Sequence, residues 1–225
     1  MLRPTSVPIS PVCFMPYPIT LDLHSRKCVV VGAGSVAERR VERLLTDSAR
    51  IVVVAPEASP AIRTLAESGK LMWTCESYAA RHIDDSFLVV AATGDRDTNA
   101  AVCRDANHLG ILVCCVDQPE EGSFTTPAVL KRGSLMITVT TSGASPTLAA
   151  VLRARLESEF GSEWQAWTTL FGLLRSRVAS LGSEADRKRA VTKVLDDVAV
   201  SRLIANGDIA GALEEAESCI SLLRV

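Results

Sequence analysis

The chain has 225 residues, 48% of them hydrophobic and 22% charged, and this balance excludes a disordered or fibrous protein. Its 24 basic and 26 acidic residues leave a formal charge of -2, so neither nucleic acid nor a membrane surface is expected as a partner. The length is enough for one ordinary domain and a smaller appendage.

The N-terminal stretch, residues 1–15, is expected to be a flexible leader. It contains Pro4, Pro8 and Pro11, and it has no apolar block long enough for a signal peptide or a membrane span. Met15 is an alternative start of translation, which the intact mass of the native protein would decide.

From residue 27 onward, short apolar strands alternate with amphipathic helices. Strands are expected at 28–31, 51–54, 71–73, 87–91 and 111–116, and helices at 35–46, 60–68 and 97–108. Continuous apolar strands are typical of a parallel sheet that helices cover on both faces. The sequence therefore predicts a Rossmann-like, doubly wound α/β domain over residues 16–126.

After Pro119 the pattern changes. A sixth strand is expected at 135–140, and a turn leads from it into a helix that begins at Ser145-Pro146. We assign residues 127–161 to a small α+β segment and residues 162–225 to a helical domain. An apolar stripe at helical spacing from Trp164 to Leu181 predicts the first helix of that domain, and two more helices are expected at 186–205 and 209–223.

The seven cysteines form no CxxC pair and have no histidine at zinc-finger spacing. We expect reduced, mostly buried thiols and therefore a cytoplasmic protein. The histidines, His24, His82 and His108, lie far apart in the sequence, and no metal site is expected from them.

A glycine-rich turn stands between the first strand and the first helix. Gly32-Ala33-Gly34-Ser35-Val36-Ala37 reads GxGxxA, in which Gly32 permits a tight turn and Gly34 lets the backbone approach a pyrophosphate. The helix N-terminus that follows attracts the anion. The alternative is an ordinary strand-to-helix turn, but the turn opens a complete α/β series and so favours a dinucleotide.

The acidic residue that binds a ribose in such sites is displaced here. The acidic residue is expected about 20 residues after the glycine turn, at the end of the second strand. Val54 occupies that position, and Glu57 follows three positions later. Glu57 is therefore a candidate ribose ligand, with a solvated carboxylate in the first turn of a helix as the alternative. No arginine closely follows the second strand, which favours NAD over NADP.

Two polar residues follow the fourth and fifth strands. Ligands of open α/β sheets bind outside the carboxyl ends of the strands, which makes Thr93 a candidate cofactor contact and Asp117 a candidate general base. The alternative for Asp117 is turn chemistry, because Gln118-Pro119 follows it.

Residues around the second unit's helix start are candidates for holding an anionic substrate. Ser145 is a capping residue at a helix N-terminus, and basic side chains lie on either side of it in the sequence. Solvated charges on a structural helix are the alternative. The candidate substrate contacts are Thr141, Ser142, Ser145, Arg132 and Arg153.

Taken together, these segments resemble the precorrin-2 dehydrogenase family, which includes the N-terminal module of bacterial siroheme synthases. The resemblance covers residues 16–159 in order and spacing. It is carried by Tyr17-Pro18-Ile19, Leu21-Asp22-Leu23, the glycine turn, Ala91-Ala92-Thr93, Val116-Asp117, Ser123-Phe124, Pro127-Ala128 and Ser142-Gly143-Ala144-Ser145-Pro146.

The resemblance implies that the chain oxidises the tetrapyrrole precorrin-2 with NAD, giving sirohydrochlorin and NADH. It places Ser35-Val36 and Pro56-Glu57 on the family's NAD contacts, and Asp117 on the aspartate that abstracts the proton. It also makes residues 127–161 a dimerisation segment and the protein a homodimer. Some members of the family also insert ferrous iron, using the same aspartate.

The chain departs from the family pattern at three positions. Cys114 stands where many relatives have asparagine, which affects the polarity expected around Asp117. Ser142-Gly143 replaces two glycines, and Thr141 falls where some members carry a phosphorylatable serine.

Two other functions stay open at this point. One is a bifunctional dehydrogenase and sirohydrochlorin ferrochelatase. The other is a non-catalytic NAD-sensing module, which would need Gly32 and Gly34 but not Asp117.

Overall fold

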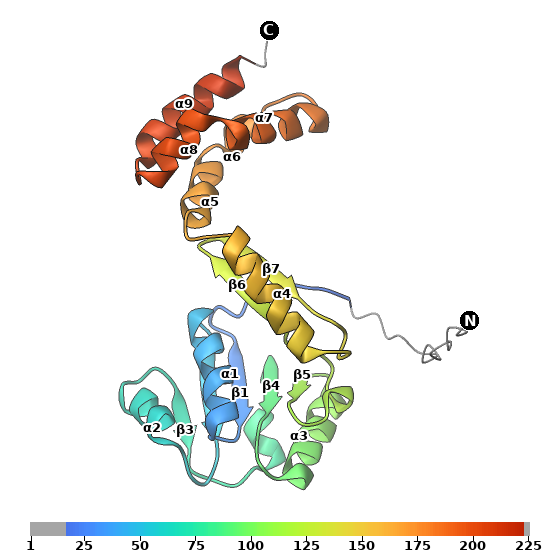
Figure 1. Ribbon diagram of the computed structural model, residues 1–225. Helices are drawn as coiled ribbons and strands as arrows, with labels where there is room; N and C mark the ends of the chain where they lie inside the picture. The colour runs from blue at the N-terminus through green and yellow to red at the C-terminus, as the bar shows by residue number, and fades with distance from the viewer. Residues whose placement is uncertain (1–16, 223–225) are drawn as a thin grey trace, which may run out of the picture. The chain divides into compact units, whose positions relative to one another are not determined.

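The computed structural model describes residues 17–222, which form two compact units that divide between Thr126 and Pro127 (Figure 1). The leader expected at residues 1–15 lies outside the described residues, as do Cys13, Met15 and the expected end of the last helix at Leu223. Within the described residues no helix is both long and apolar enough to cross a membrane.

The first unit is built on a parallel sheet with the strand order β3-β2-β1-β4-β5. The strands are β1 Lys27–Val31, β2 Arg50–Val54, β3 Met72–Thr74, β4 Leu88–Ala91 and β5 Leu112–Cys115. The chain winds outward from β1 to β3 and then returns to start β4 on the other side of β1. A crevice for a ligand is expected at this reversal, at the carboxyl ends of β1 and β4.

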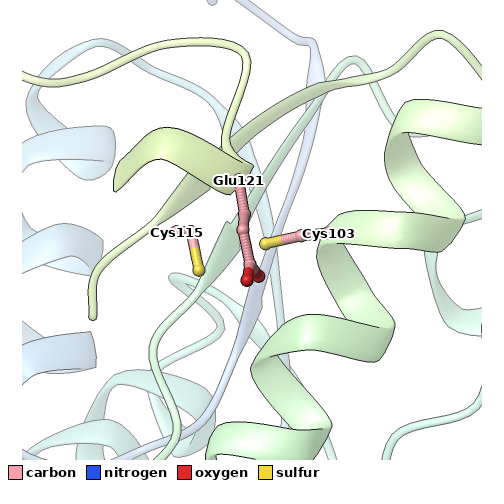
Figure 2. Close-up of side chains that lie close together, drawn as sticks. All are labelled: Cys103, Cys115 and Glu121. Atoms are coloured by element: carbon pink, nitrogen blue, oxygen red, sulfur yellow. The ribbon is translucent and has the colours of Figure 1, made fainter. Parts of the chain in front are cut away.

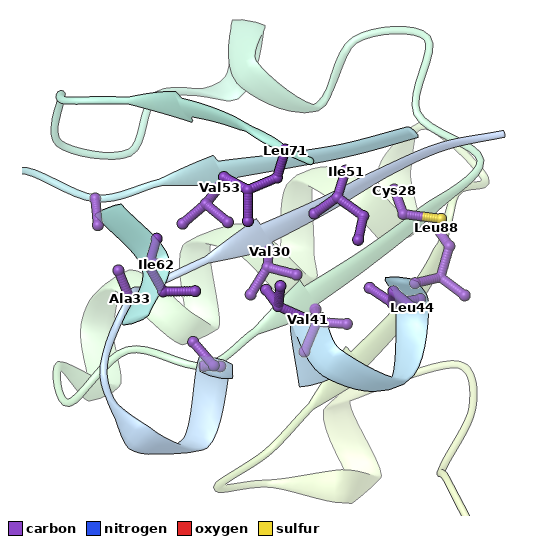
Figure 3. Close-up of a cluster of buried hydrophobic side chains, with 14 of the residues drawn as sticks. Cys28, Val30, Ala33, Val41, Leu44, Ile51, Val53, Ile62, Leu71 and Leu88 are labelled. Carbon is purple, nitrogen blue, oxygen red and sulfur yellow. The ribbon is translucent and has the colours of Figure 1, made fainter. Parts of the chain in front are cut away.

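Helices cover both faces of the sheet, as the apolar strands predict. Helices α1 Ser35–Thr46 and α2 Pro60–Glu67 pack on one face, where Cys28, Val30 and Val53 are buried (Figure 3). On the other face, the short helix η1 Ala80–Ile83 and helix α3 Arg96–His108 cover Val29, Val31 and Val89. Each fully buried valine stabilises the fold by roughly 1.5–3 kcal/mol relative to exposure. Because a shifted register would expose these side chains, their burial fixes the register of the sheet.

The second unit begins with an antiparallel hairpin of β6 Ala128–Arg132 and β7 Leu135–Val139, against which α4 Pro146–Glu159 packs. Strand β6 was not predicted from the sequence. Of its five residues only Leu130 is fully buried, so the strand has no clear apolar alternation. The short helix η2 Pro119–Glu121, in the first unit, was also not predicted.

Five helices complete the second unit around Trp167, Leu170 and other buried residues. They are α5 Trp164–Leu173, α6 Arg175–Ala179, α7 Glu184–Asp196, α8 Val198–Ala205 and α9 Ile209–Ser221. Two of the expected continuous helices are wrong, because the stripe at 164–181 is divided at Leu174 and the helix at 186–205 at Asp197. The Asp197 backbone is extended, and its carboxylate accepts hydrogen bonds from the amides of Ala199 and Val200 as the cap of α8.

Candidate functional site

The glycine turn after β1 has a backbone that only glycine accommodates at its first position. Gly32 has a φ of +108°, and a Cβ atom built there would lie 2.4 Å from the carbonyl oxygen of Ala92. The amide of Gly32 donates to the carbonyl of Val54, at a distance of 2.9 Å. Gly32 therefore holds the turn against the ends of β2 and β4.

Gly34 differs, because the space around it is open. It is the N-cap of α1, it has no side chain to cap the first turn, and a Cβ atom there would meet nothing within 4 Å. Ser35 and Val36 follow it on the exposed first turn, and Ala37 is fully buried against the sheet. The amides of this turn are left for an anion, which fits the pyrophosphate of a dinucleotide.

The loop after β2 lies beside the glycine turn. The amide of Ser59 donates to the carbonyl of Ala33 at 3.2 Å, so that the preceding residues Pro56 and Glu57 flank the turn. Both side chains are exposed. No hydrogen bond or ion pair is found for the Glu57 carboxylate within the described residues, so its role as a ribose ligand stays a prediction.

After β4, Thr93 is held by a buried amide, that of Asn99 on α3. The Oδ1 atom of Asn99 accepts from the Thr93 amide at 3.0 Å and lies 2.8 Å from the Thr93 hydroxyl, while Nδ2 donates to the Thr93 carbonyl at 3.2 Å. Asn99 is 1% exposed. Because both ends of this amide are used, the loop after β4 has a fixed position at the sheet edge.

Asp117 follows β5 at the same edge, and its side chain is one-third exposed. Partial burial acts to raise its pKa, but hydrogen bonds from the side chains of Cys115 and Asn99 and the charge of Arg96 outweigh this effect. The Cys115 sulfur lies 3.2 Å from Oδ1, and Nε of Arg96 lies 3.8 Å from Oδ2. The pKa of Asp117 is therefore lowered, and at neutral pH the carboxylate is ionised, the state that accepts a proton.

The arginine beside Asp117 is shared with a second carboxylate. Arg96, in the first turn of α3, also pairs with Glu121 of η2. Neither Arg96 nor Asn99 was predicted as part of the site. No signal in the sequence marks them, because polar residues are ordinary in an amphipathic helix and the burial of Asn99 becomes visible only in the structure.

Cys114, which was expected to change the polarity around Asp117, lies instead on the other face of the sheet. Cys114 is buried in the cluster covered by α1 and α2, whereas Cys115, on the α3 face, contacts Asp117. All the described cysteines are free, and five of the six are buried, as predicted.

In the second unit the turn before α4 is held by its own side chains. The Thr141 hydroxyl accepts from the Ser145 amide at 3.0 Å and lies 3.1 Å from the Ser145 carbonyl, and Ser145 caps α4 by accepting from Leu148. Ser142 is exposed, with a φ of +52°. Glycine adopts this left-handed backbone more readily than serine does.

The two arginines expected to bind substrate both have partners within the second unit. Nε of Arg132 donates to the carbonyl of Phe160 at 3.0 Å, and Nη1 of Arg153 pairs with Glu157 at 2.5 Å. Arg132 is thus at the C-terminal end of α4, about 20 Å from Ser145 along the helix by its rise per residue. The structure therefore does not bring Arg132 and Ser145 together at one end of α4.

The structure thus brings Gly32, Gly34, Thr93 and Asp117 to the carboxyl edge of one sheet. A phosphate cradle and an ionised carboxylate on one edge can bind a dinucleotide and accept a proton from a molecule beside it.

Comparison with known proteins gives matches to both units. Residues 19–128 match a family described as putative NAD(P)-binding, and residues 132–159 match one described as the central part of a sirohaem biosynthesis protein. The chain is 36% identical over 202 residues to siroheme synthase 3 of Aeromonas hydrophila, covering 89% of this chain and 43% of that protein. It is 36% identical over 205 residues to a siroheme synthase of Chromobacterium violaceum, covering 91% and 44%.

Among solved structures, the precorrin-2 dehydrogenase SirC matches with a TM-score of 0.69 and 26% identity, covering 90% of this chain and all of that one. The chain spans less than half the length of the siroheme synthases it matches.

Proposed function

We propose that this chain, which belongs to the precorrin-2 dehydrogenase family together with the first part of bacterial siroheme synthases, oxidises precorrin-2 to sirohydrochlorin with NAD. The observation that carries this proposal is the placement of Asp117, ionised and partly exposed, on the sheet edge that also bears the glycine cradle.

The reaction removes two electrons and two protons from the substrate. NAD, when bound, accepts one hydrogen with both electrons as a hydride, and the second hydrogen leaves as a proton. Asp117 accepts that proton. Its ionised state is maintained by Cys115, Asn99 and Arg96, so no other group has to remove a proton from Asp117 before the substrate arrives. The products are sirohydrochlorin, NADH and one proton.

The residues near the glycine turn fit NAD. The amides of Ser35 and Val36 face the pyrophosphate over the open space at Gly34, and Glu57 binds the ribose. Thr93, fixed by Asn99, supports the part of the cofactor that lies toward Asp117.

The substrate is a tetrapyrrole that carries several carboxylates. We assign its binding to Thr141, Ser142 and Ser145 at the N-terminus of α4, to Arg153 on that helix and to Arg132 at the end of β6, in a homodimer formed through residues 127–161. The free buried thiols fit the reducing cytoplasm as the place of the reaction.

The test is Asp117→Asn, compared with Asp97→Asn as a control on an exposed acid of α3. Each protein is mixed with NAD and precorrin-2 made in situ. We expect Asp117→Asn to bind NAD with unchanged affinity and to lose at least about a hundred-fold in kcat, the scale of a general base, while the control keeps its activity. Unchanged turnover in Asp117→Asn would remove the base from the proposal.

The same assay separates the alternatives. If the wild-type protein binds NAD but never reduces it with precorrin-2, the chain is a nucleotide-sensing module. If ferrous ion added after the oxidation yields siroheme at a rate above that without protein, the chain is also a ferrochelatase.

A further inference from the structure

Behind Asp117, on the α3 face of the sheet, two thiols and a carboxylate come together from three elements. Cys103 lies on α3, Cys115 is the last residue of β5, and Glu121 ends η2. Their ligand atoms, two sulfurs and a carboxylate oxygen, all lie within 4.8 Å of one another. Figure 2 shows the Glu121 carboxylate between the two sulfur atoms.

This cluster is buried but accessible from solvent on one side. Cys103 and Cys115 are each 1% exposed, whereas the side chain of Glu121 is 37% exposed. A pocket of about 360 Å³ opens onto Cys103 and Glu121, and its other lining residues are Ala100, Arg104, Asn107 and Glu120. The pocket therefore gives an ion a path to Cys103 and Glu121, and the Cys115 sulfur lies within 4.8 Å of their ligand atoms.

We propose that Cys103, Cys115 and Glu121 form a binding site for a thiophilic divalent cation of the Zn²⁺ class. Two thiolates and one carboxylate are ligand types that select Zn²⁺ or Co²⁺ over Mg²⁺ or Ca²⁺. Three protein ligands leave one position of a tetrahedron for water from the pocket. The site is separate from the residues proposed to hold NAD. It includes Cys115, whose thiol contacts Asp117, so a bound ion would remove that hydrogen-bond donor.

The charges around the cluster support this proposal. The three ionised ligands carry three negative charges, and a divalent cation leaves one of them uncompensated. Arg96, which pairs with Glu121 and lies 3.8 Å from Asp117, supplies a positive charge at the rim. The thiols lose their protons on binding, which a metal drives even for buried cysteines.

A second group of this kind in the described part of the chain is a weaker candidate. Asp197, Glu215 and Cys219 also place their ligand atoms within 4.8 Å of one another, but this group offers one sulfur. Asp197 already accepts hydrogen bonds from two backbone amides as the cap of α8. The number of sulfur atoms around a bound ion therefore distinguishes the two groups.

The test uses the purified, reduced full chain without NAD or substrate. Co²⁺ is titrated in without oxygen, and thiolate-to-metal absorption in the near ultraviolet is followed. We expect one equivalent to bind with this absorption. Cys103→Ser and Cys115→Ser should lose the two-thiolate absorption, and Glu121→Gln should weaken binding by about ten-fold or more. Cys75→Ser, at an exposed thiol, and Cys219→Ser should bind as the wild type does.

If the serine variants fail to fold, X-ray absorption of the Co²⁺-loaded wild-type chain decides the question instead. Two sulfur neighbours at about 2.3 Å are expected. One sulfur neighbour, loss of binding in Cys219→Ser, or no thiolate absorption at all would overturn the proposal. The titration is read without NAD or substrate, so the absence of a metal site would not contradict the dehydrogenase reaction, and the two proposals fail separately.

Discussion

At the scale of single residues, the two glycines of the turn have different tasks, and a methyl group added at each should separate them. Gly32→Ala places a Cβ atom 2.4 Å from the Ala92 carbonyl oxygen in a backbone with φ +108°. We expect it to destabilise the fold by about 2–4 kcal/mol. Gly34→Ala meets open space, so it should cost less than about 1 kcal/mol of stability.

The two variants should also be distinguished by their affinity for NAD. Gly34→Ala fills the space where the pyrophosphate approaches, so a stable protein with at least about ten-fold weaker NAD binding is expected. Thermal unfolding and calorimetric titration with NAD measure the two effects. Wild-type NAD affinity in Gly34→Ala would mean that the pyrophosphate lies elsewhere.

The pKa of Asp117 is the second prediction at this scale. Burial raises it, but the hydrogen bonds from Cys115 and Asn99 and the charge of Arg96 prevail, so its midpoint should lie below the ordinary 3.8. Above that midpoint the carboxylate is ionised and accepts a proton, and it loses this capacity only as the pH falls through the lowered pKa. A titration of the Asp117 carboxyl carbon by NMR measures the midpoint directly.

Removal of a hydrogen-bond donor from Asp117 should raise the pKa of this carboxyl group. Cys115→Ala takes away the thiol that lies 3.2 Å from Oδ1, so the midpoint should move upward, whereas the control Cys75→Ala should leave it in place. A downward shift in Cys115→Ala would show that the thiol does not stabilise the carboxylate.

Which residues the sequence reveals depends on whether their role is local. Gly32 and Gly34 are visible because the turn needs them within a few residues of one strand end. Asn99 and Arg96 act on Asp117 across 18 and 21 positions of the chain, through the packing of α3 on β5, and nothing local marks them. The cluster of Cys103, Cys115 and Glu121 was not predicted for the same reason, because its residues come from three different elements.

At the scale of elements, the turn that enters α4 contains a non-glycine residue in a left-handed conformation. Ser142 has a φ of +52°, which costs an L-residue about 1 kcal/mol or more. Ser142→Gly should therefore raise the free energy of unfolding by about 0.5–1 kcal/mol, and urea unfolding measures the change. The comparison variant Ser145→Ala, which removes the α4 cap, should lower it by about 1 kcal/mol. A destabilised Ser142→Gly would contradict this account of the turn.

The elements themselves were predicted where burial is regular. Helix α1 has the bounds that its amphipathic pattern gives, and the five parallel strands differ from expectation by one or two residues at their ends. Strand β6 was missed because charged Lys131 and Arg132 end it and only Leu130 is fully buried. The break at Asp197 was missed because apolar spacing continues across it, while the capping side chain stops the helix.

At the scale of the whole molecule, the chain consists of a nucleotide-binding sheet and a second unit with a core of its own. The Rossmann-like class, predicted from the sequence, is confirmed, and the matches to an NAD(P)-binding family, a sirohaem biosynthesis family and a precorrin-2 dehydrogenase structure agree with the predicted family. The assembly and the substrate contacts remain predictions, because they depend on surfaces rather than on the pattern of one chain.

The proposed reaction of this chain is the transfer of a hydride from precorrin-2 to NAD. The most direct measurement mixes the purified wild-type protein with NAD and precorrin-2 made in situ, without oxygen, and follows NADH and the tetrapyrrole spectrum together. We expect one NADH for each sirohydrochlorin formed, at a rate proportional to the protein concentration. Sirohydrochlorin without NADH, or bound NAD that stays oxidised while precorrin-2 persists, would contradict it.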